Sequence, residues 1–232
     1  MGNVVEELKK QMQHEIIFFD LDGTLVETAP EIMDAVNDTL SYFDWPCVTQ
    51  SLVEEWIGHG TKELLIKAIA LVTHQTEQDA RVSPELKDAL PVFERHYQLR
   101  CGTRSQLYPY VREALAHLRA DGVKLVVMTN KEGIYTQILL REQNLIDAFD
   151  MVISGDTFKV KKPDPTGVEL CLNRWGISKV KALFVGDSSI DAATAKNAGI
   201  SVWLLPYGYN MGAHISACMP DRVVADFSEF IK

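Results

Sequence analysis

The sequence lacks the cysteine and histidine patterns that mark disulfide frameworks and zinc sites. Its four cysteines, at positions 47, 101, 171 and 218, are widely scattered and form no CxxC pair. The histidines at positions 14, 74, 96, 117 and 214 form no HxH or HExxH pattern, so we treat them as surface or core residues. We therefore expect reduced thiols, with neither a disulfide framework nor a zinc knuckle.

An excess of positive charge and a long apolar run are absent as well. The formal net charge is −9, and duplex binding depends on clustered Lys and Arg, so we expect no nucleic-acid partner. No apolar run approaches the length of a membrane span, and the first fifteen residues are too polar for a secretory signal. We expect a cytoplasmic protein without a membrane partner, as a monomer or a homodimer.

Short apolar runs with the composition of doubly covered strands recur along the chain. They are residues 16–19, 123–128, 151–153, 182–185, 202–205 and 223–224. Helical patterns lie between most of them, beginning after Pro109 and near Gly133, Pro165 and Ile190. This alternation predicts a parallel α/β sheet. Residues 4–12 also have a helical pattern, without catalytic groups.

The alternation is interrupted between about residues 28 and 105, where every pattern is helical. One helix is expected to begin at Pro30, a second after Thr61 as its N-cap, and a third after Ser83-Pro84. We interpret this stretch as a helical insert that directly follows the first strand. The sheet domain is then built from the beginning and the end of the chain.

Two aspartates, Asp20 and Asp22, come directly after the first apolar run, in the sequence IIFFDLDGT. Two residues apart in extended chain, they point to the same side, at the strand end where ligands of open α/β sheets gather. The carboxylates repel each other unless a cation lies between them, and their hard oxygen atoms favour Mg²⁺. Taken alone, DLDG is equally typical of a strand that exits into a turn.

Polar groups also follow the later strands. Thr129-Asn130 ends one strand with a hydroxyl and an amide, the kinds of donor that bind phosphate oxygens, and Asp187 and Asp191 follow another. Lys162 lies between them, beside Pro163. Each piece alone can be a helix cap, a loop or a solvated patch. Four such pieces at strand ends favour one shared site.

The order DLDGT, TN, KKP and GDSSID resembles the four motifs of the haloacid dehalogenase superfamily of phosphotransferases. The resemblance covers nearly the whole chain from about residue 14. It implies a Rossmann-like α/β core, with a parallel sheet flanked by helices, and a helical cap of the first type inserted after the first strand. The implied division gives a catalytic core of residues 1–27 and 106–232 and a cap of residues 28–105.

Several shorter stretches are similar to the bacterial phosphoglycolate phosphatase family. They include ETAPEIMDAVN, WIGHG, ALPVFERHY, LYPYV, TNKE, SGDTFKVKKPDP, LFVGDSSIDAATAKNAG and YGYN. The chain departs from that family at Glu132, where TNKP is usual, at Tyr110, where LYPGV is usual, and at KPDPTG, where KPHPAP is usual. None of these departures touches a motif residue.

The resemblance implies a phosphoric monoester hydrolase that uses Mg²⁺. Asp20 would be the nucleophile that forms an aspartyl-phosphate, and Asp22 the general acid and then the general base. The metal would be held by a carboxylate oxygen of Asp20, the backbone carbonyl of Asp22 and the carboxylate of Asp187. Asp191 would hold it from further out, through water.

The same resemblance assigns the phosphoryl group to residues of the second and third motifs. Thr129 and the backbone amide of Asn130 would bind its oxygens, and Lys162 would neutralise charge on it and on Asp20. Gly23 and Thr24 would complete the substrate-binding loop of the first motif.

The cap would select the substrate, a small phosphorylated metabolite. His59 and Gly60 are candidates for contacting its far end, such as a carboxylate, and Thr61 and Lys62 for helping through a helix N-terminus. A hinge or a packing turn explains Gly58-His59-Gly60 equally well. Likewise Tyr207–Asn210 can line the site or form a turn.

The expected substrate is 2-phosphoglycolate, which gives glycolate and phosphate. Pyrophosphate, a nucleoside monophosphate, a sugar phosphate or mutase chemistry on the same scaffold stays open. A non-enzymatic phosphate-binding relative predicts a damaged motif, and the motif residues are all present. A dehalogenase would not need Asp22 as an acid, so Asp22 argues against one.

Overall fold

A six-stranded parallel sheet forms the centre of the computed structural model, which describes residues 14–231. The strand order is β5-β4-β1-β6-β7-β8, and each neighbouring pair is parallel. The strands are β1 (Ile16–Phe19), β4 (Lys124–Met128), β5 (Met151–Ile153), β6 (Ala182–Gly186), β7 (Ser201–Leu204) and β8 (Arg222–Val223). The predicted fold class is confirmed, and every apolar run predicted as a strand lies within one residue of its observed bounds. The helical pattern of residues 4–12 lies outside the described residues.

The central strand β1 explains why these runs are continuously apolar. Successive side chains of a strand point to opposite faces, and both faces of this sheet are covered. Ile17 and Phe19 pack into one hydrophobic cluster, and Ile16 and Phe18 pack into another. All four residues are at most 2% exposed. The sheet therefore has a core on each face and holds the ends of its strands rigidly.

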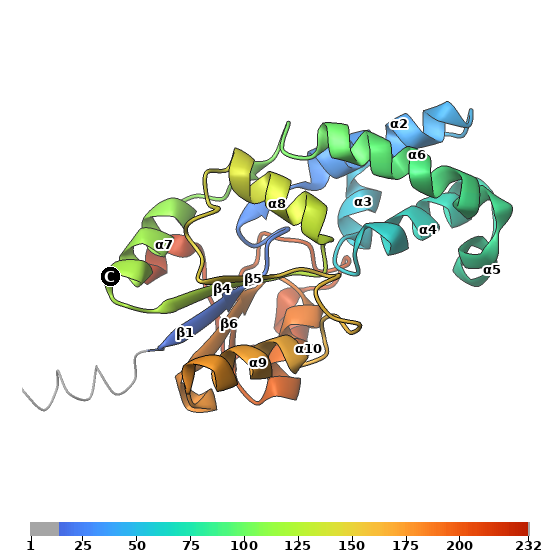
Figure 1. Ribbon diagram of the computed structural model, residues 1–232. Helices are drawn as coiled ribbons and strands as arrows, with labels where there is room; N and C mark the ends of the chain where they lie inside the picture. Colours follow the sequence, from blue (N-terminus) through green and yellow to red (C-terminus); the bar gives the residue numbers. More distant parts are fainter. Residues whose placement is uncertain (1–13, 232) are drawn as a thin grey trace, which may run out of the picture.

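Helices cover the two faces of the sheet (Figure 1). Those on one side are α7 (Val111–Ala120) and α8 (Gly133–Glu142), and those on the other are α9 (Thr166–Trp175) and α10 (Ser189–Ala198). Short 3₁₀ turns occupy Lys179–Lys181, Ile215–Cys218 and Phe227–Phe230. This is the layered arrangement that the alternation of strand and helix predicted.

A group of helices lies beyond the carboxyl ends of the strands (Figure 1). They are α2 (Ala29–Tyr42), α3 (Gln50–Trp56), α4 (Thr61–Val72), α5 (Glu77–Val82) and α6 (Pro84–Arg100). We call residues 28–105 the cap and the rest of the described chain the core; the boundaries between the two stay an interpretation. The short helices α3 and α5 were not predicted.

The predicted helix starts in the cap have mixed outcomes. The Ser83 hydroxyl accepts a hydrogen bond from the Leu86 amide, as an N-cap should. Thr61 as the N-cap of α4 is wrong, because Gly60 holds that position with φ at 95°. Thr61 is instead the first residue of the helix, and its hydroxyl donates to Glu132 of the core.

Two short antiparallel strands, β2 (Val26–Glu27) and β3 (Gln106–Leu107), connect the cap to the core. Beside them Glu31, at the start of α2, is fully buried. Its carboxylate accepts hydrogen bonds from the backbone amides of Gly102 (3.0 Å), Arg104 (3.2 Å) and Ser105 (2.9 Å). This one side chain therefore ties the segment that leaves the core to the segment that returns.

Glu31→Ala is expected to lower the free energy of unfolding by about 3 kcal/mol, because it leaves three amides of the return segment without their acceptor. Asp34→Ala is the matched control one turn along the same helix. Asp34 pairs with the half-exposed Arg104 side chain at 2.8 Å, so its loss should cost less than about 1 kcal/mol. Urea unfolding of both variants checks this, and equal losses would contradict the role of Glu31.

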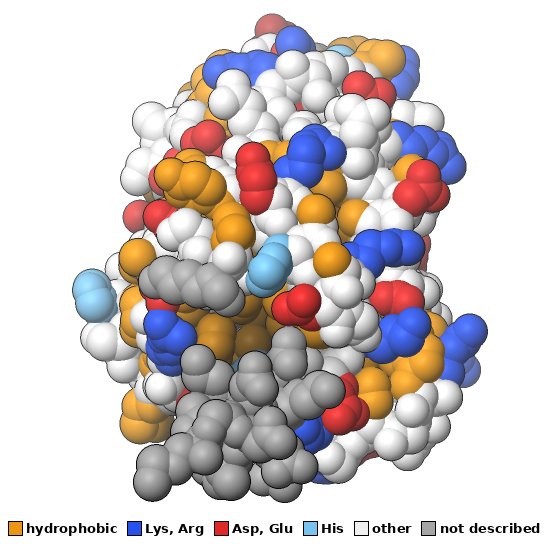
Figure 2. All heavy atoms as spheres, turned by 90° about the vertical axis from the view of Figure 1, so that its left-hand side faces the viewer, with side chains coloured by type: hydrophobic (Ala, Val, Ile, Leu, Met, Phe, Trp, Pro, Cys, Tyr) orange, Lys and Arg blue, Asp and Glu red, His pale blue; other side chains and the backbone are white. Residues whose placement is uncertain are grey.

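The described surface carries both signs of charge. Figure 2 shows Lys and Arg side chains interspersed with Asp and Glu over the described part of one face. In residues 14–231, no helix combines the length and the apolar character needed to cross a membrane.

Candidate active site

Three adjacent strands bring the predicted motifs to one edge of the sheet. Asp20 directly follows β1, Thr129 directly follows β4, and Asp187 directly follows β6. Because β1 pairs with both β4 and β6, these residues meet at the carboxyl ends of neighbouring strands. The loop after β5 brings Lys162 to the same place, within 2.8 Å of Asp20.

Asp20, Asp187 and Asp191 form a buried cluster of carboxylates. One ligand oxygen from each lies within 4.8 Å of the others, and none of the three residues is more than 7% exposed. Burial raises the pKa of Asp20 to about 7, although Lys162 opposes part of that rise. Burial, Asp191 and Asp20 together raise the pKa of Asp187 well above its usual range. A cation among these oxygens would offset that cost.

The donor set of this cluster fits a hard divalent cation. Its ligands are carboxylate oxygens, with no sulfur or imidazole among the described residues of the cluster. Asp187 is also held in place, since its oxygens accept hydrogen bonds from the Thr24 hydroxyl and the Tyr209 amide, both at 2.5 Å. An oriented carboxylate is what a metal site requires of its ligands.

Lys162 lies between two members of the cluster. Its Nζ is 2.8 Å from Asp20 Oδ1 and 2.7 Å from Asp191 Oδ1, and its side chain is 2% exposed. Burial lowers the pKa of Lys162, but the two carboxylates outweigh burial and raise it. The lysine is therefore charged and fixed, with its ammonium group at the nucleophile predicted from the sequence.

Gly23 and Thr24 lie against Asp187 of the cluster. Gly23 has φ at 81°, and a Cβ there would lie 2.4 Å from Asp187 Oδ2, so only glycine fits. Thr24 is buried and bonded to Asp187. Neither residue lines the pocket described below. Tyr209 also links this region to the cap, because its hydroxyl accepts from the amides of Thr28 and Ala29.

Asp22 is bound by a lysine that the sequence did not single out. Lys131 Nζ lies 2.8 and 3.0 Å from the two carboxylate oxygens of Asp22, and the Thr28 hydroxyl donates to the same carboxylate at 2.7 Å. Lys131 is 3% exposed and lies over the Tyr97 ring of the cap. In the sequence, the signal that could have pointed to Lys131 is its position directly after Thr129-Asn130.

Thr129 and Asn130 occupy the loop after β4. The Thr129 hydroxyl accepts a hydrogen bond from the Lys131 amide at 3.2 Å. The Asn130 side-chain amide donates to the carbonyls of Gly58 (2.9 Å) and Lys162 (3.1 Å). Asn130 therefore ties a loop of the cap to the loop that carries Lys162.

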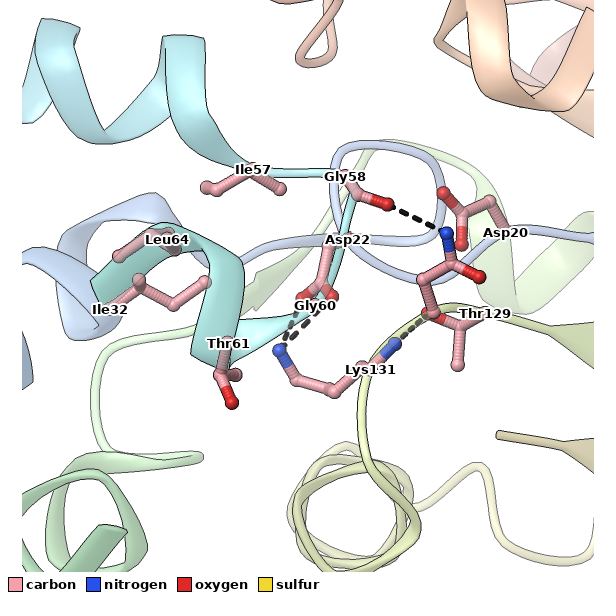
Figure 3. Close-up of a pocket in the computed structure, with 11 residues that line it drawn as sticks. Asp20, Asp22, Ile32, Ile57, Gly58, Gly60, Thr61, Leu64, Thr129 and Lys131 are labelled. Carbon is pink, nitrogen blue, oxygen red and sulfur yellow. Dashed lines mark hydrogen bonds and ion pairs between the residues drawn. The ribbon is translucent and has the colours of Figure 1, made fainter. Parts of the chain in front are cut away.

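A small pocket lies between cap and core at this point (Figure 3). The core contributes Asp20, Asp22, Thr129, Asn130 and Lys131. The cap contributes Ile32, Ile57, Gly58, Gly60, Thr61 and Leu64. The cavity is about 30 Å³, room for only about two waters, so a ligand larger than this needs the cap to move.

His59 does not line this pocket, although its neighbours Gly58 and Gly60 do. The imidazole is exposed at the surface. Gly60 has a positive φ, and a Cβ there would lie 3.0 Å from the Asn130 carbonyl. The glycines let the cap loop approach the core closely. Tyr207 also reaches the first motif, since its hydroxyl donates to the Thr24 carbonyl at 3.1 Å.

Known relatives of the chain cover it almost from end to end. Residues 17–205 match the family model of the haloacid dehalogenase-like hydrolases. A phosphoglycolate phosphatase from Colwellia psychrerythraea is 34% identical over 225 residues, which are 96% of this chain and 97% of that protein. One from Nitrosospira multiformis is 37% identical and covers 93% of each chain.

A solved structure from Haemophilus somnus, described as a predicted phosphoglycolate phosphatase, has the same architecture. It superimposes with a TM-score of 0.88 at 32% identity and covers 94% of this chain and 97% of its own. The family and the enzyme class that the sequence motifs implied, a phosphoric monoester hydrolase, are confirmed by these relatives. The chain belongs to the haloacid dehalogenase-like hydrolase family.

Proposed function

We propose that this enzyme is a Mg²⁺-dependent phosphatase that hydrolyses 2-phosphoglycolate to glycolate and phosphate through an aspartyl-phosphate on Asp20. The observation that carries the proposal is the buried cluster of Asp20, Asp187 and Asp191, with Lys162 between two of its carboxylates. Burying three carboxylates this close together costs free energy unless a cation pairs with them. Buried groups with strongly shifted pKa values also gather at functional sites.

Asp20 and Asp187 would hold the metal through carboxylate oxygens, and Asp22 through its backbone carbonyl. Asp191 would act through water, because one of its oxygens already accepts from Lys162 and the other from the Ser188 hydroxyl. The bound cation would reduce the repulsion between Asp20 and the incoming phosphate.

Asp20 attacks the phosphorus, so that a bond forms from its carboxylate oxygen and the bond from phosphorus to the glycolate oxygen breaks. Asp22 gives its proton to the departing oxygen. In the second step Asp22 takes a proton from water, whose oxygen attacks the phosphorus and releases Asp20 and inorganic phosphate. The two steps together consume one water and leave the enzyme unchanged.

The transferred phosphoryl group is bound by the Thr129 hydroxyl, the Asn130 backbone amide and Lys162. The position of Lys162 supports this role, since its Nζ is within 2.8 Å of the attacking carboxylate. A fixed cation there stabilises negative charge on the phosphoryl oxygens as the bonds rearrange.

Two observations support 2-phosphoglycolate as the substrate. The relatives from Colwellia psychrerythraea and Nitrosospira multiformis are named phosphoglycolate phosphatases and match the chain over its length. The pocket is also small, with a cavity of about 30 Å³ between cap and core. A short tail needs less movement of the cap than a sugar or a nucleoside does, so both observations favour a phosphate ester with a short tail over a sugar phosphate or a nucleotide.

Phosphate release from a substrate panel tests the proposal. With Mg²⁺, we expect the highest kcat/KM for 2-phosphoglycolate and values at least about 10-fold lower for pyrophosphate, a nucleoside monophosphate and a hexose phosphate. The tails of a nucleoside monophosphate and a hexose phosphate are larger, and pyrophosphate releases a phosphate in place of glycolate. Faster release from one of the others would overturn the substrate assignment. No release from any of them would overturn the phosphatase itself.

A further inference from the structure

We infer that Lys131 is the residue that recognises the second negative charge of the substrate, a carboxylate one carbon away from the phosphate ester. This inference rests on the proposed phosphatase function and names the group that selects among its substrates. It assigns to Lys131 the contact that the sequence suggested for His59.

The lining of the pocket is uneven in charge. Lys131 is the sole Lys or Arg among the described residues that line it. From the cap, the lining receives Ile32, Ile57 and Leu64, the backbone of the glycine loop, and Thr61, whose hydroxyl donates to Glu132 (Figure 3). A carboxylate on the substrate tail would lose its hydration there unless a buried cation paired with it.

The position of Lys131 also matches the length of the tail. Figure 3 shows its ammonium group pointing at Asp22, with Gly60 and Thr61 of the cap beside it. The nitrogen is within 3.0 Å of both carboxylate oxygens of Asp22, which protonates the ester oxygen in the proposed reaction. In 2-phosphoglycolate one methylene separates the ester oxygen from the carboxylate carbon. A tail carboxylate bound by Lys131 therefore leaves the ester oxygen next to Asp22.

No other described cation near the pocket combines a place in its lining with contact to Asp22. Lys162 is held between Asp20 and Asp191, on the phosphate side. Lys161 and His59 are exposed and outside the lining. Among the residues that the structure describes, Lys131 alone combines burial, a place in the lining and contact with Asp22.

Kinetics with a matched pair of esters tests the inference. Wild-type enzyme with Mg²⁺ should prefer 2-phosphoglycolate over ethyl phosphate, which has a similar length and no carboxylate, by at least about 10-fold in kcat/KM. Lys131→Met should reduce that preference by about 10- to 100-fold, because it removes a charged hydrogen bond to the carboxylate alone. Lys159→Met, an exposed lysine in the loop before Lys162, should leave the preference unchanged.

Each outcome bears on Lys131. If Lys131→Met slows both esters equally, the lysine only positions Asp22 and the inference is overturned; an unchanged preference overturns it too. If Lys131→Met does not fold, the preference between the two esters is measured in Lys131→Arg and in wild-type enzyme instead. A wild-type enzyme that hydrolyses both esters equally well contradicts the inference. Wild-type enzyme that hydrolyses neither ester refutes the proposed function instead.

Discussion

Asp20→Asn is expected to reduce phosphate release from 2-phosphoglycolate by at least about 1,000-fold, because an amide cannot attack phosphorus to form the aspartyl-phosphate. The shape of the side chain is nearly kept, so the fold should survive. Steady-state assays with Mg²⁺ measure the loss. Asp38→Asn, at an ion pair on the outside of the cap, is the control and should keep wild-type activity.

The same substitution separates catalysis from stability. The folded pKa of Asp20, about 7, lies above its usual value of 3.8, so ionised Asp20 costs stability, and this cost grows as the pH rises from about 4 to about 7. At pH 8 without metal, Asp20→Asn should therefore be at least as stable as wild type while inactive. A variant that is both inactive and unfolded at pH 8 would contradict this account of the cluster.

Lys162→Met is expected to lower the free energy of unfolding by about 3–5 kcal/mol in metal-free protein at pH 8, because it leaves Asp20 and Asp191 buried without their common partner. It should also reduce phosphate release by at least about 100-fold. Urea unfolding in the presence of EDTA measures the stability. Lys159→Met serves as the control, since this lysine is exposed in the same loop.

The pH dependence of that loss has a definite sign. Lys162 opposes part of the rise in the pKa of Asp20, so without it Asp20 favours its protonated form still more, and the deficit should be small near pH 4 and grow as the pH rises. A deficit that is the same for Lys162→Met and Lys159→Met would show that the buried pairing contributes nothing.

The sheet and the motif residues were predictable because each rests on a local pattern. Strands covered on both faces need continuously apolar runs, which stand out in the sequence. Polar residues at the ends of three such runs then had to meet, because parallel strands end at one edge. This is why Asp20, Thr129 and Asp187 could be grouped without a structure.

The missed features depend on contacts between distant segments. β2 and β3 are two residues each, too short for a pattern, and are defined by pairing across the whole cap. In the sequence alone, Lys131 cannot be distinguished from an ordinary solvent-exposed lysine. The fold buries it against Asp22, which is 109 residues away.

Two departures from the phosphoglycolate phosphatase pattern have physical consequences. Tyr110 has φ at 65°, a left-handed conformation, which accounts for the glycine usual at this position. Glu132 accepts a hydrogen bond at 2.9 Å from Thr61, the first residue of α4. In this chain the residue after Lys131 therefore contacts the cap, a tie that the proline usual there could not make.

Phosphate release from 2-phosphoglycolate, measured for wild type and Asp20→Asn with either Mg²⁺ or EDTA, tests the central claim most directly. The account predicts release by wild type with Mg²⁺ alone, and at least about 1,000-fold less in the other three conditions. Release by wild type that persists in EDTA, or by Asp20→Asn at the wild-type rate, would contradict the assignment of a metal-dependent nucleophile at Asp20.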